Sequence, residues 1–143
     1  MSATSRINVW LLAGALLGGL SVALGAFGAH RLESRLKEPD GTMTALAVRK
    51  IANWETAARY QMYHALALVG IGCLSDRRRT IWMQLSGAAM TAGSLIFSGC
   101  LYALVITDQR ILGAIVPIGG VLMLIGWLLL VIAVGTAAPS ESA

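Results

Sequence analysis

The sequence predicts an all-α integral membrane protein, a single bundle of four transmembrane helices with a partly helical interfacial loop between the first and second. Hydrophobic residues make up 57% of the 143 residues and charged residues only 13%, against roughly 25% charged residues in soluble proteins. A soluble domain this small could not bury so much apolar surface. In addition, four long apolar segments alternate with polar ones. We expect one domain over residues 1–135 and a disordered polar tail over residues 136–143.

The first apolar segment runs from Val9 to Ala29 and is interrupted only by Ser21. About 20 apolar residues are enough for a helix to cross a hydrocarbon core roughly 30 Å thick. A cleaved secretory signal is the alternative, but its apolar core is usually about 7–15 residues long. Phe27 also breaks the small-x-small pattern of a cleavage site. We therefore expect a retained membrane anchor.

The long polar stretch from His30 to Asn53 separates the first span from the second. Pro39 and Gly41 predict a turn within it. A helical pattern resumes at Thr44 and predicts an interfacial lead-in to the second span, which we place roughly at Tyr60–Leu74. This stretch is the partly helical loop of the predicted fold.

Two short polar turns bound the last two spans. Ser75–Thr80 holds three consecutive arginines, and Thr107–Arg110 is the second turn. They leave apolar segments at Ile81–Ile106 and Ile111–Val134, both long enough to cross a bilayer with some tilt. Short connections favour antiparallel neighbours, so we expect an up-down-up-down bundle with both termini on one side of the membrane.

The basic residues give two opposed indications of orientation. The side of the termini carries Arg6 and the arginine triplet Arg77–Arg79, whereas the side of the long loop carries seven basic residues. A plain count places the long loop in the cytoplasm. The triplet, however, lies in a turn that is too short for any role but that of a topology signal. Because this turn is on the side of the termini, the triplet places the termini, and not the long loop, in the cytoplasm.

Four motifs resemble one family of membrane proteins. They are LGAFGAH at Leu24–His30, WxxAxxYQMYHALAL at Trp54–Leu68, FSGCLY at Phe97–Tyr102 and PIGG at Pro117–Gly120, which Trp127 follows. Over roughly Val9–Val134, the chain resembles the family of domain of unknown function 423, which includes the eukaryotic transmembrane protein 256.

The resemblance implies a four-span architecture and no established biochemical activity. Bacterial relatives tend to carry basic residues in the second turn and the tail, which implies a bacterial inner (plasma) membrane protein with both termini cytoplasmic. This chain departs from the family in a tail without basic residues, in Cys100 where Ser is usual, and in Val116 where Thr often precedes the proline.

Small residues predict close contacts between the helices. In lipid, small side chains allow two helix backbones to approach each other. Pro117 can break or bend the fourth helix, as in transporters whose broken helices line a substrate site, or it can be a tolerated kink. The candidate packing and kink residues are Gly14, Gly18, Ser94, Ser98, Pro117, Gly119 and Gly120.

Both histidines fall near the membrane face that carries the long loop, and other polar residues fall at the same level. Ionisable groups at membrane depth are costly, so they usually have a partner or a purpose. A structural explanation is also open: His30 can stabilise a helix C-terminus, His64 can bond a carbonyl or Tyr102, and Glu55 and Arg59 can form an ordinary i,i+4 pair. The candidate polar layer comprises His30, Glu55, Arg59, Tyr60, Gln61, His64, Tyr102 and Asp108.

The sequence predicts no metal and no cofactor. Two histidines fall short of a zinc site with three or four protein ligands, and nothing indicates that they oppose each other across a haem. Cys73 and Cys100 fall near opposite membrane faces, too far apart for a disulfide.

Two classes of function fit these observations. The first is a non-enzymatic accessory, scaffold or assembly protein that acts through helix packing. The alternative is a small oligomeric transporter or channel that uses the polar layer at one membrane face. A membrane enzyme with His64 as base ranks last because no nucleophile or metal accompanies that histidine.

The expected partners are the lipid bilayer and a homo-oligomer or larger membrane complex. We expect no nucleic acid because the basic residues lie at the ends of apolar segments.

Overall fold

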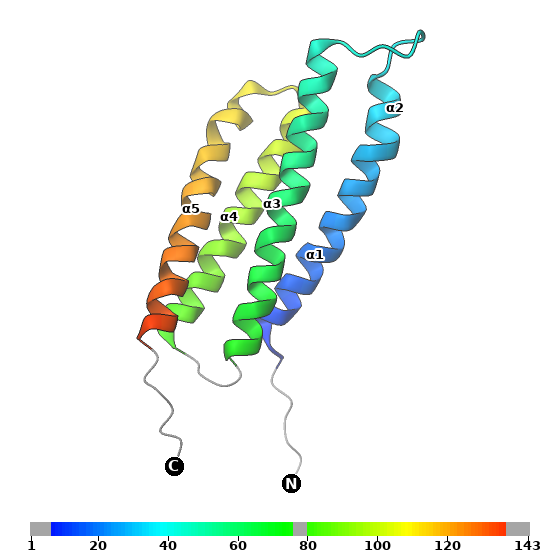
Figure 1. Ribbon diagram of the computed structural model, residues 1–143. Coiled ribbons are helices and arrows are strands. Elements are labelled where there is room, and N and C mark those ends of the chain that lie inside the picture. The colour runs from blue at the N-terminus through cyan, green and yellow to red at the C-terminus, as the bar shows by residue number, and fades with distance from the viewer. Residues whose placement is uncertain (1–6, 76–79, 137–143) are drawn as a thin grey trace, which may run out of the picture.

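The computed structural model describes residues 7–75 and 80–136, and within them the protein is helical without a strand (Figure 1). The all-α prediction is therefore confirmed. Arg6, the arginine triplet and the predicted disordered tail beyond residue 136 lie outside the described residues. The elements are α1 (Val9–Phe27), the π-helix η1 (Gly28–Leu32), α2 (Glu33–Leu36), α3 (Ala45–Ser75), α4 (Ile81–Thr107) and α5 (Arg110–Gly135).

Capping residues fix the helix ends. The Asn8 side chain accepts hydrogen bonds from the backbone N–H groups of Trp10 and Leu11 and starts α1, and the Thr80 hydroxyl accepts one from Met83 and starts α4. Asp108 ends α4 in the left-handed conformation, with φ 58°. These caps satisfy backbone groups that a helix end leaves without an intrahelical partner.

The loop between the first two spans is shorter than the sequence predicts. η1 and α2 continue α1 directly, and α3 begins at Ala45, so the connection covers only residues 37–44. Gly41 turns the chain there with a φ of +82°, a conformation that glycine adopts without steric cost. The helical part of the predicted loop belongs to the ends of the two flanking helices.

Three helical segments are long and apolar enough to cross a membrane: Val9–Leu36, Ile81–Thr107 and Arg110–Gly135. α3 is longer than the predicted second span, which forms its second half, and it is more polar than the other three helices. It lies between α1 and α4 (Figure 1), and its polar residues Gln61 and His64 are buried in the bundle.

The helices are arranged in the order α1, α3, α4, α5, and each packs on the next (Figure 1). Neighbours run antiparallel, and α1 begins at the same end of the bundle at which α5 terminates. The central core lies where α1, α3 and α4 meet and consists of Leu17, Ala65, Leu68, Ile71 and Met90.

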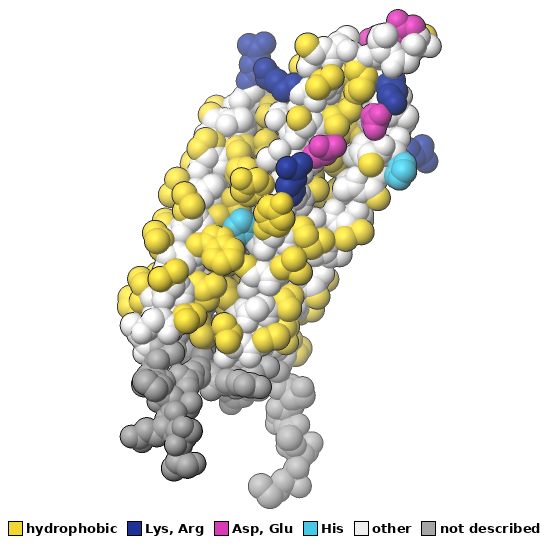
Figure 2. Space-filling view, in the orientation of Figure 1, with side chains coloured by type: hydrophobic (Ala, Val, Ile, Leu, Met, Phe, Trp, Pro, Cys, Tyr) yellow, Lys and Arg dark blue, Asp and Glu magenta, His cyan; other side chains and the backbone are white. Residues whose placement is uncertain are grey.

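Charged side chains gather at the end of the bundle that carries the 37–44 loop, and hydrophobic side chains cover the rest of the face in Figure 2. All charged residues in the described part of the chain lie at positions 31–59, 108 and 110. A helix of 31 residues is roughly 46 Å long, whereas the hydrocarbon core is roughly 30 Å thick. The charged end therefore has the length to extend into the head-group region.

Candidate functional site

The candidate polar layer does not form one cluster. Gln61 and His64 are buried between helices, whereas five other members are exposed on different elements. The bundle directs these side chains toward different neighbours, so the layer consists of several separate contacts. The exposed members are His30, Glu55, Arg59, Tyr60 and Asp108.

His64 links α3 to α5. The indole N–H of Trp127 donates a hydrogen bond to His64 Nε2 at 3.2 Å. His64 Nδ1 lies 2.8 Å from the carbonyl oxygen of Tyr60. Because an indole N–H can only donate, Nε2 is the acceptor and Nδ1 carries the proton that Tyr60 accepts. Both nitrogens of the imidazole therefore have a protein partner.

Gln61 links α3 to α1. Its side-chain amide donates to the carbonyl oxygen of Leu17 at 2.8 Å, and one turn further along the same contact the Ser21 hydroxyl donates to the carbonyl of Ala58 at 2.7 Å. Both polar groups are buried. In hydrocarbon such bonds satisfy groups that have no water to bind, so they hold the helix pair together.

Trp54 joins two of the motifs that carry the family resemblance. Its indole packs directly on Gly28, where no side chain would fit, and its N–H donates to the carbonyl of Leu24 at 2.7 Å. The Tyr102 ring lies 4.6 Å from the Trp54 ring. The Tyr102 hydroxyl has no hydrogen-bond partner among the described residues. Of the two bonds open to His64 in the sequence, to a carbonyl or to Tyr102, the structure contains the first, since His64 contacts the carbonyl of Tyr60, which lies in α3 rather than in a loop, and Trp127.

The exposed charged members make peripheral contacts. Glu55 and Arg59 are 4.0 Å apart on the surface of α3, and Asp108 pairs with Lys50 at 2.7 Å. Exposed ion pairs of this kind contribute about 0–1 kcal/mol to stability. His30 lies exposed in η1 rather than at the end of α1.

Gly14 and Gly18 form a GxxxG motif on α1, and the two glycines differ in their surroundings. A Cβ added at Gly14 would lie 2.7 Å from the Ala65 carbonyl oxygen of α3, whereas one at Gly18 would lie 3.7 Å from the Ala65 Cβ. Gly14 therefore marks the close approach between α1 and α3, and Gly18 has ordinary space.

The contact between α4 and α5 shows the same contrast. A Cβ at Gly119 would lie 2.5 Å from the Phe97 backbone nitrogen, while one at Gly120 would have 3.9 Å to the Phe97 ring. α5 runs through Pro117 without interruption. The break that would serve a transporter is therefore not present in this helix.

The two candidate serines of α4 lie buried on the bundle interior. Ser98 donates to the carbonyl of Ala57 on α3 at 2.8 Å. The Ser94 hydroxyl has no partner among the described residues. A third serine, Ser86, which the sequence does not single out, donates to Gly126 on α5 at 2.7 Å. Serine-to-carbonyl bonds thus connect α4 to both neighbouring helices.

An apolar groove of about 450 Å³ opens beside His64 between α3, α4 and α5. Aromatic rings form much of its wall, and its remaining residues are small or aliphatic. Gly120 lies in it, and a Cβ added there would make only an ordinary van der Waals contact with the Phe97 ring. The groove is lined by Tyr60, His64, Phe97, Pro117, Gly120, Val121, Met123, Leu124 and Trp127.

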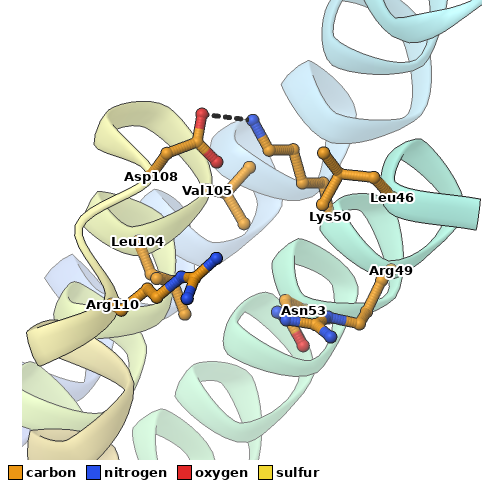
Figure 3. A pocket seen from close by; sticks show the side chains of 8 residues that line it. All are labelled: Leu46, Arg49, Lys50, Asn53, Leu104, Val105, Asp108 and Arg110. Carbon is orange, nitrogen blue, oxygen red and sulfur yellow. Dashed lines mark hydrogen bonds and ion pairs between the residues drawn. The ribbon is translucent and has the colours of Figure 1, made fainter.

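A second pocket, of about 320 Å³, lies at the charged end between α3, the end of α4 and the start of α5 (Figure 3). Three cationic side chains and one carboxylate line it together with Asn53 and three apolar residues. The sequence treats Arg49, Lys50 and Arg110 only as topology signals, because nothing in linear spacing indicates that position 110 meets positions 49 and 50. The full lining is Leu46, Arg49, Lys50, Asn53, Leu104, Val105, Asp108 and Arg110.

Within residues 7–75 and 80–136, no group of three or more histidine, cysteine, aspartate or glutamate side chains could hold a metal ion. Cys73 and Cys100 are free thiols. The histidine that a membrane enzyme would use as a base already donates and accepts a bond.

Comparison with known proteins identifies one family. Residues 24–120 match the family model described as Protein of unknown function (DUF423). A UPF0382 membrane protein of Staphylococcus epidermidis is 45% identical over 127 residues, which cover 89% of this chain and 95% of that protein. The UPF0382 membrane protein YwdK of Bacillus subtilis is 41% identical over 128 residues, with 89% and 96% covered. No solved structure shows a significant match.

Proposed function

The chain belongs to the DUF423 family of membrane proteins, and on that premise we propose that it is a non-enzymatic accessory, scaffold or assembly subunit that acts through helix packing. The observation that supports this proposal is that the buried polar side chains form hydrogen bonds between helices. Gln61 and His64, the buried members of the candidate layer, each bond a group on another helix. These polar groups therefore serve to stabilise the bundle, and we assign the function of the protein to the outer surface of the bundle.

The apolar groove beside His64 is the surface that we assign to this role. Helices associate in lipid through close packing at small residues rather than through the hydrophobic effect. Gly120 offers such a position, and the Tyr60, Phe97 and Trp127 rings provide a concave aromatic wall around it. A transmembrane helix of a partner subunit or of a second copy would fill the groove along α5.

A transporter or channel has less support. It would require a polar path, but the buried polar residues of α3 are occupied in helix-to-helix bonds and α5 is continuous at Pro117. The groove itself is mainly apolar. We therefore rank the transporter below the packing subunit.

The proposal places the protein in a bacterial inner (plasma) membrane with both termini in the cytoplasm. A helical bundle fits the inner membrane, since outer-membrane proteins of bacteria are β-barrels. Three consecutive arginines at positions 77–79 follow α3 and precede α4 in the sequence, and basic residues in short loops favour the cytoplasm. A fluorescent protein fused to the C-terminus, which matures only in the cytoplasm, should fluoresce; a dark but intact fusion would reverse the orientation.

Native mass spectrometry of the protein extracted gently from its own membrane tests the proposed function. We expect a second subunit at fixed stoichiometry, whose mass distinguishes a partner from a second copy. Leu124→Trp, in the groove, should remove it. Leu16→Trp, on α1, is the matched control, since the two leucines are each 65% exposed. A monomer without a retained protein would contradict the proposal, and a small-molecule mass that disappears in His64→Ala would favour ligand transport.

A further inference from the structure

We propose that the pocket between α3, α4 and α5 at the charged end binds the phosphate of an anionic membrane lipid. This site lies apart from the groove assigned above and does not depend on it. Figure 3 shows the side chains of Arg49, Asn53 and Arg110 in the space below the Lys50–Asp108 ion pair. The pocket thus collects donors from two helices that are far apart in the sequence.

The charge balance of the pocket favours an anion. Lys50 and Asp108 neutralise each other at 2.7 Å. Arg49 and Arg110 form no ion pair with any carboxylate of the described chain. Two guanidinium groups that line one pocket repel each other, more strongly near low-dielectric surroundings than in bulk water. An anion between them would replace that repulsion with two attractive contacts.

The chemistry of the donors points to phosphate. A guanidinium presents paired N–H groups that match two phosphate oxygens, with stronger and more directional bonds than a neutral donor makes. Asn53 adds an amide N–H₂ donor. Arg110 is the first residue of α5, so the positive end of that helix faces the same region.

The position in the membrane points to a lipid rather than a free ion. The pocket lies at the end of the bundle where the charged residues gather, the end that has the length to extend into the head-group region. Leu46, Leu104 and Val105 supply its apolar wall. A lipid can place its phosphate on the arginines while its acyl chains follow the apolar surface of the helices, and basic pockets between transmembrane helices bind anionic head groups in this manner.

Native mass spectrometry of delipidated protein in detergent tests the site, with phosphatidylglycerol and phosphatidylcholine of the same acyl chains as probes. We expect the protein to retain phosphatidylglycerol preferentially. The double variant Arg49→Gln/Arg110→Gln should lower that retention about tenfold. The control Arg31→Gln/Arg35→Gln removes the same charge from exposed residues near the same end of the bundle and should retain the lipid. Circular dichroism should show unchanged helix content in both variants.

Three results would overturn the proposal. Equal retention of the two lipids would show that the head-group charge is not recognised. An equal loss in the control variant would show general electrostatic attraction rather than a pocket. Displacement of phosphatidylglycerol by millimolar inorganic phosphate would identify the site as one for a soluble anion.

Discussion

The indole N–H of Trp127 on α5 donates to the Nε2 atom of His64 on α3 across 3.2 Å. The two rings meet edge to face, with centroids 6.2 Å apart. This contact selects one tautomer of the histidine, in which Nε2 accepts and Nδ1 donates to Tyr60. It also bridges two helices that are not adjacent in the order of the bundle.

Trp127→Phe should therefore destabilise the protein. The change keeps an aromatic ring but leaves His64 Nε2 without its donor, and a lost interhelical bond of this kind costs about 0.5–2 kcal/mol. Denaturation by sodium dodecyl sulfate, followed by circular dichroism, would report the decrease in the free energy of unfolding.

Trp82→Phe is the matched control for this variant. Trp82 is 39% exposed, and its indole N–H makes no hydrogen bond within the described residues. Its replacement should change the free energy of unfolding little. Equal losses in the two variants would show that ring packing, rather than the bond to His64, accounts for the effect.

Substitution of the two glycines of the GxxxG motif of α1 by alanine should affect the stability of the protein to different degrees. Gly14→Ala places a Cβ against the Ala65 carbonyl and forces α1 away from α3, at a cost of about 1–3 kcal/mol for an overpacked contact. Gly18→Ala creates only an ordinary van der Waals contact and should leave stability near that of the parent. The same denaturation assay compares them, and equal sensitivity at both positions would contradict the observed geometry.

The helix boundaries follow from the sequence because polar turns interrupt the apolar segments. The third span is predicted at Ile81–Ile106 and α4 covers Ile81–Thr107. The first connection is harder to predict from the sequence. Residues 30–36 and 45–53 are polar enough to suggest a loop, yet they are helical, because a helix that extends beyond the hydrocarbon core can carry charges. Polarity alone does not distinguish a loop from a helix that projects into the head-group region.

The residues of the candidate polar layer do not form one cluster, and the reason is geometric. Residues three apart on a helix differ in direction by roughly 60° after nearly a full turn. On α3, which has neighbours on several sides, that difference is enough to direct Gln61 to α1 and His64 to α5. Sequence spacing predicts which residues share a level of the membrane. The partner that each residue meets depends on the order of the helices in the bundle.

The effect of substitutions at Asp108 on stability should depend more on the backbone conformation of this residue than on the loss of its charge. It occupies the left-handed region, with φ 58°, and its carboxylate is 63% exposed beside Lys50. Asp108→Ala removes the ion pair and retains the strain of a Cβ at positive φ. Asp108→Gly removes both, so it should be more stable than the alanine variant by about 1 kcal/mol. Thermal unfolding in detergent would rank them, and an alanine variant as stable as the glycine variant would contradict the conformational account.

Gly119 and Gly120 are sequence neighbours with different predicted responses to alanine. Gly119→Ala brings a Cβ within 2.5 Å of the Phe97 backbone nitrogen, so α4 and α5 must separate, with an expected loss of about 1–3 kcal/mol. Gly120→Ala meets only the Phe97 ring at 3.9 Å. It should preserve the stability of the single chain and can raise it, because alanine favours the helix by about 1 kcal/mol over glycine.

The same two variants separate folding from assembly. Gly120 lies in the apolar groove, so a methyl group there should weaken the docking of a partner helix while the chain itself stays folded. Gly119→Ala should lower the denaturation midpoint of the isolated chain. Loss of stability in Gly120→Ala would contradict the ordinary packing at this position. Unchanged assembly together with unchanged stability would show that this face of α5 is not a contact surface for another helix.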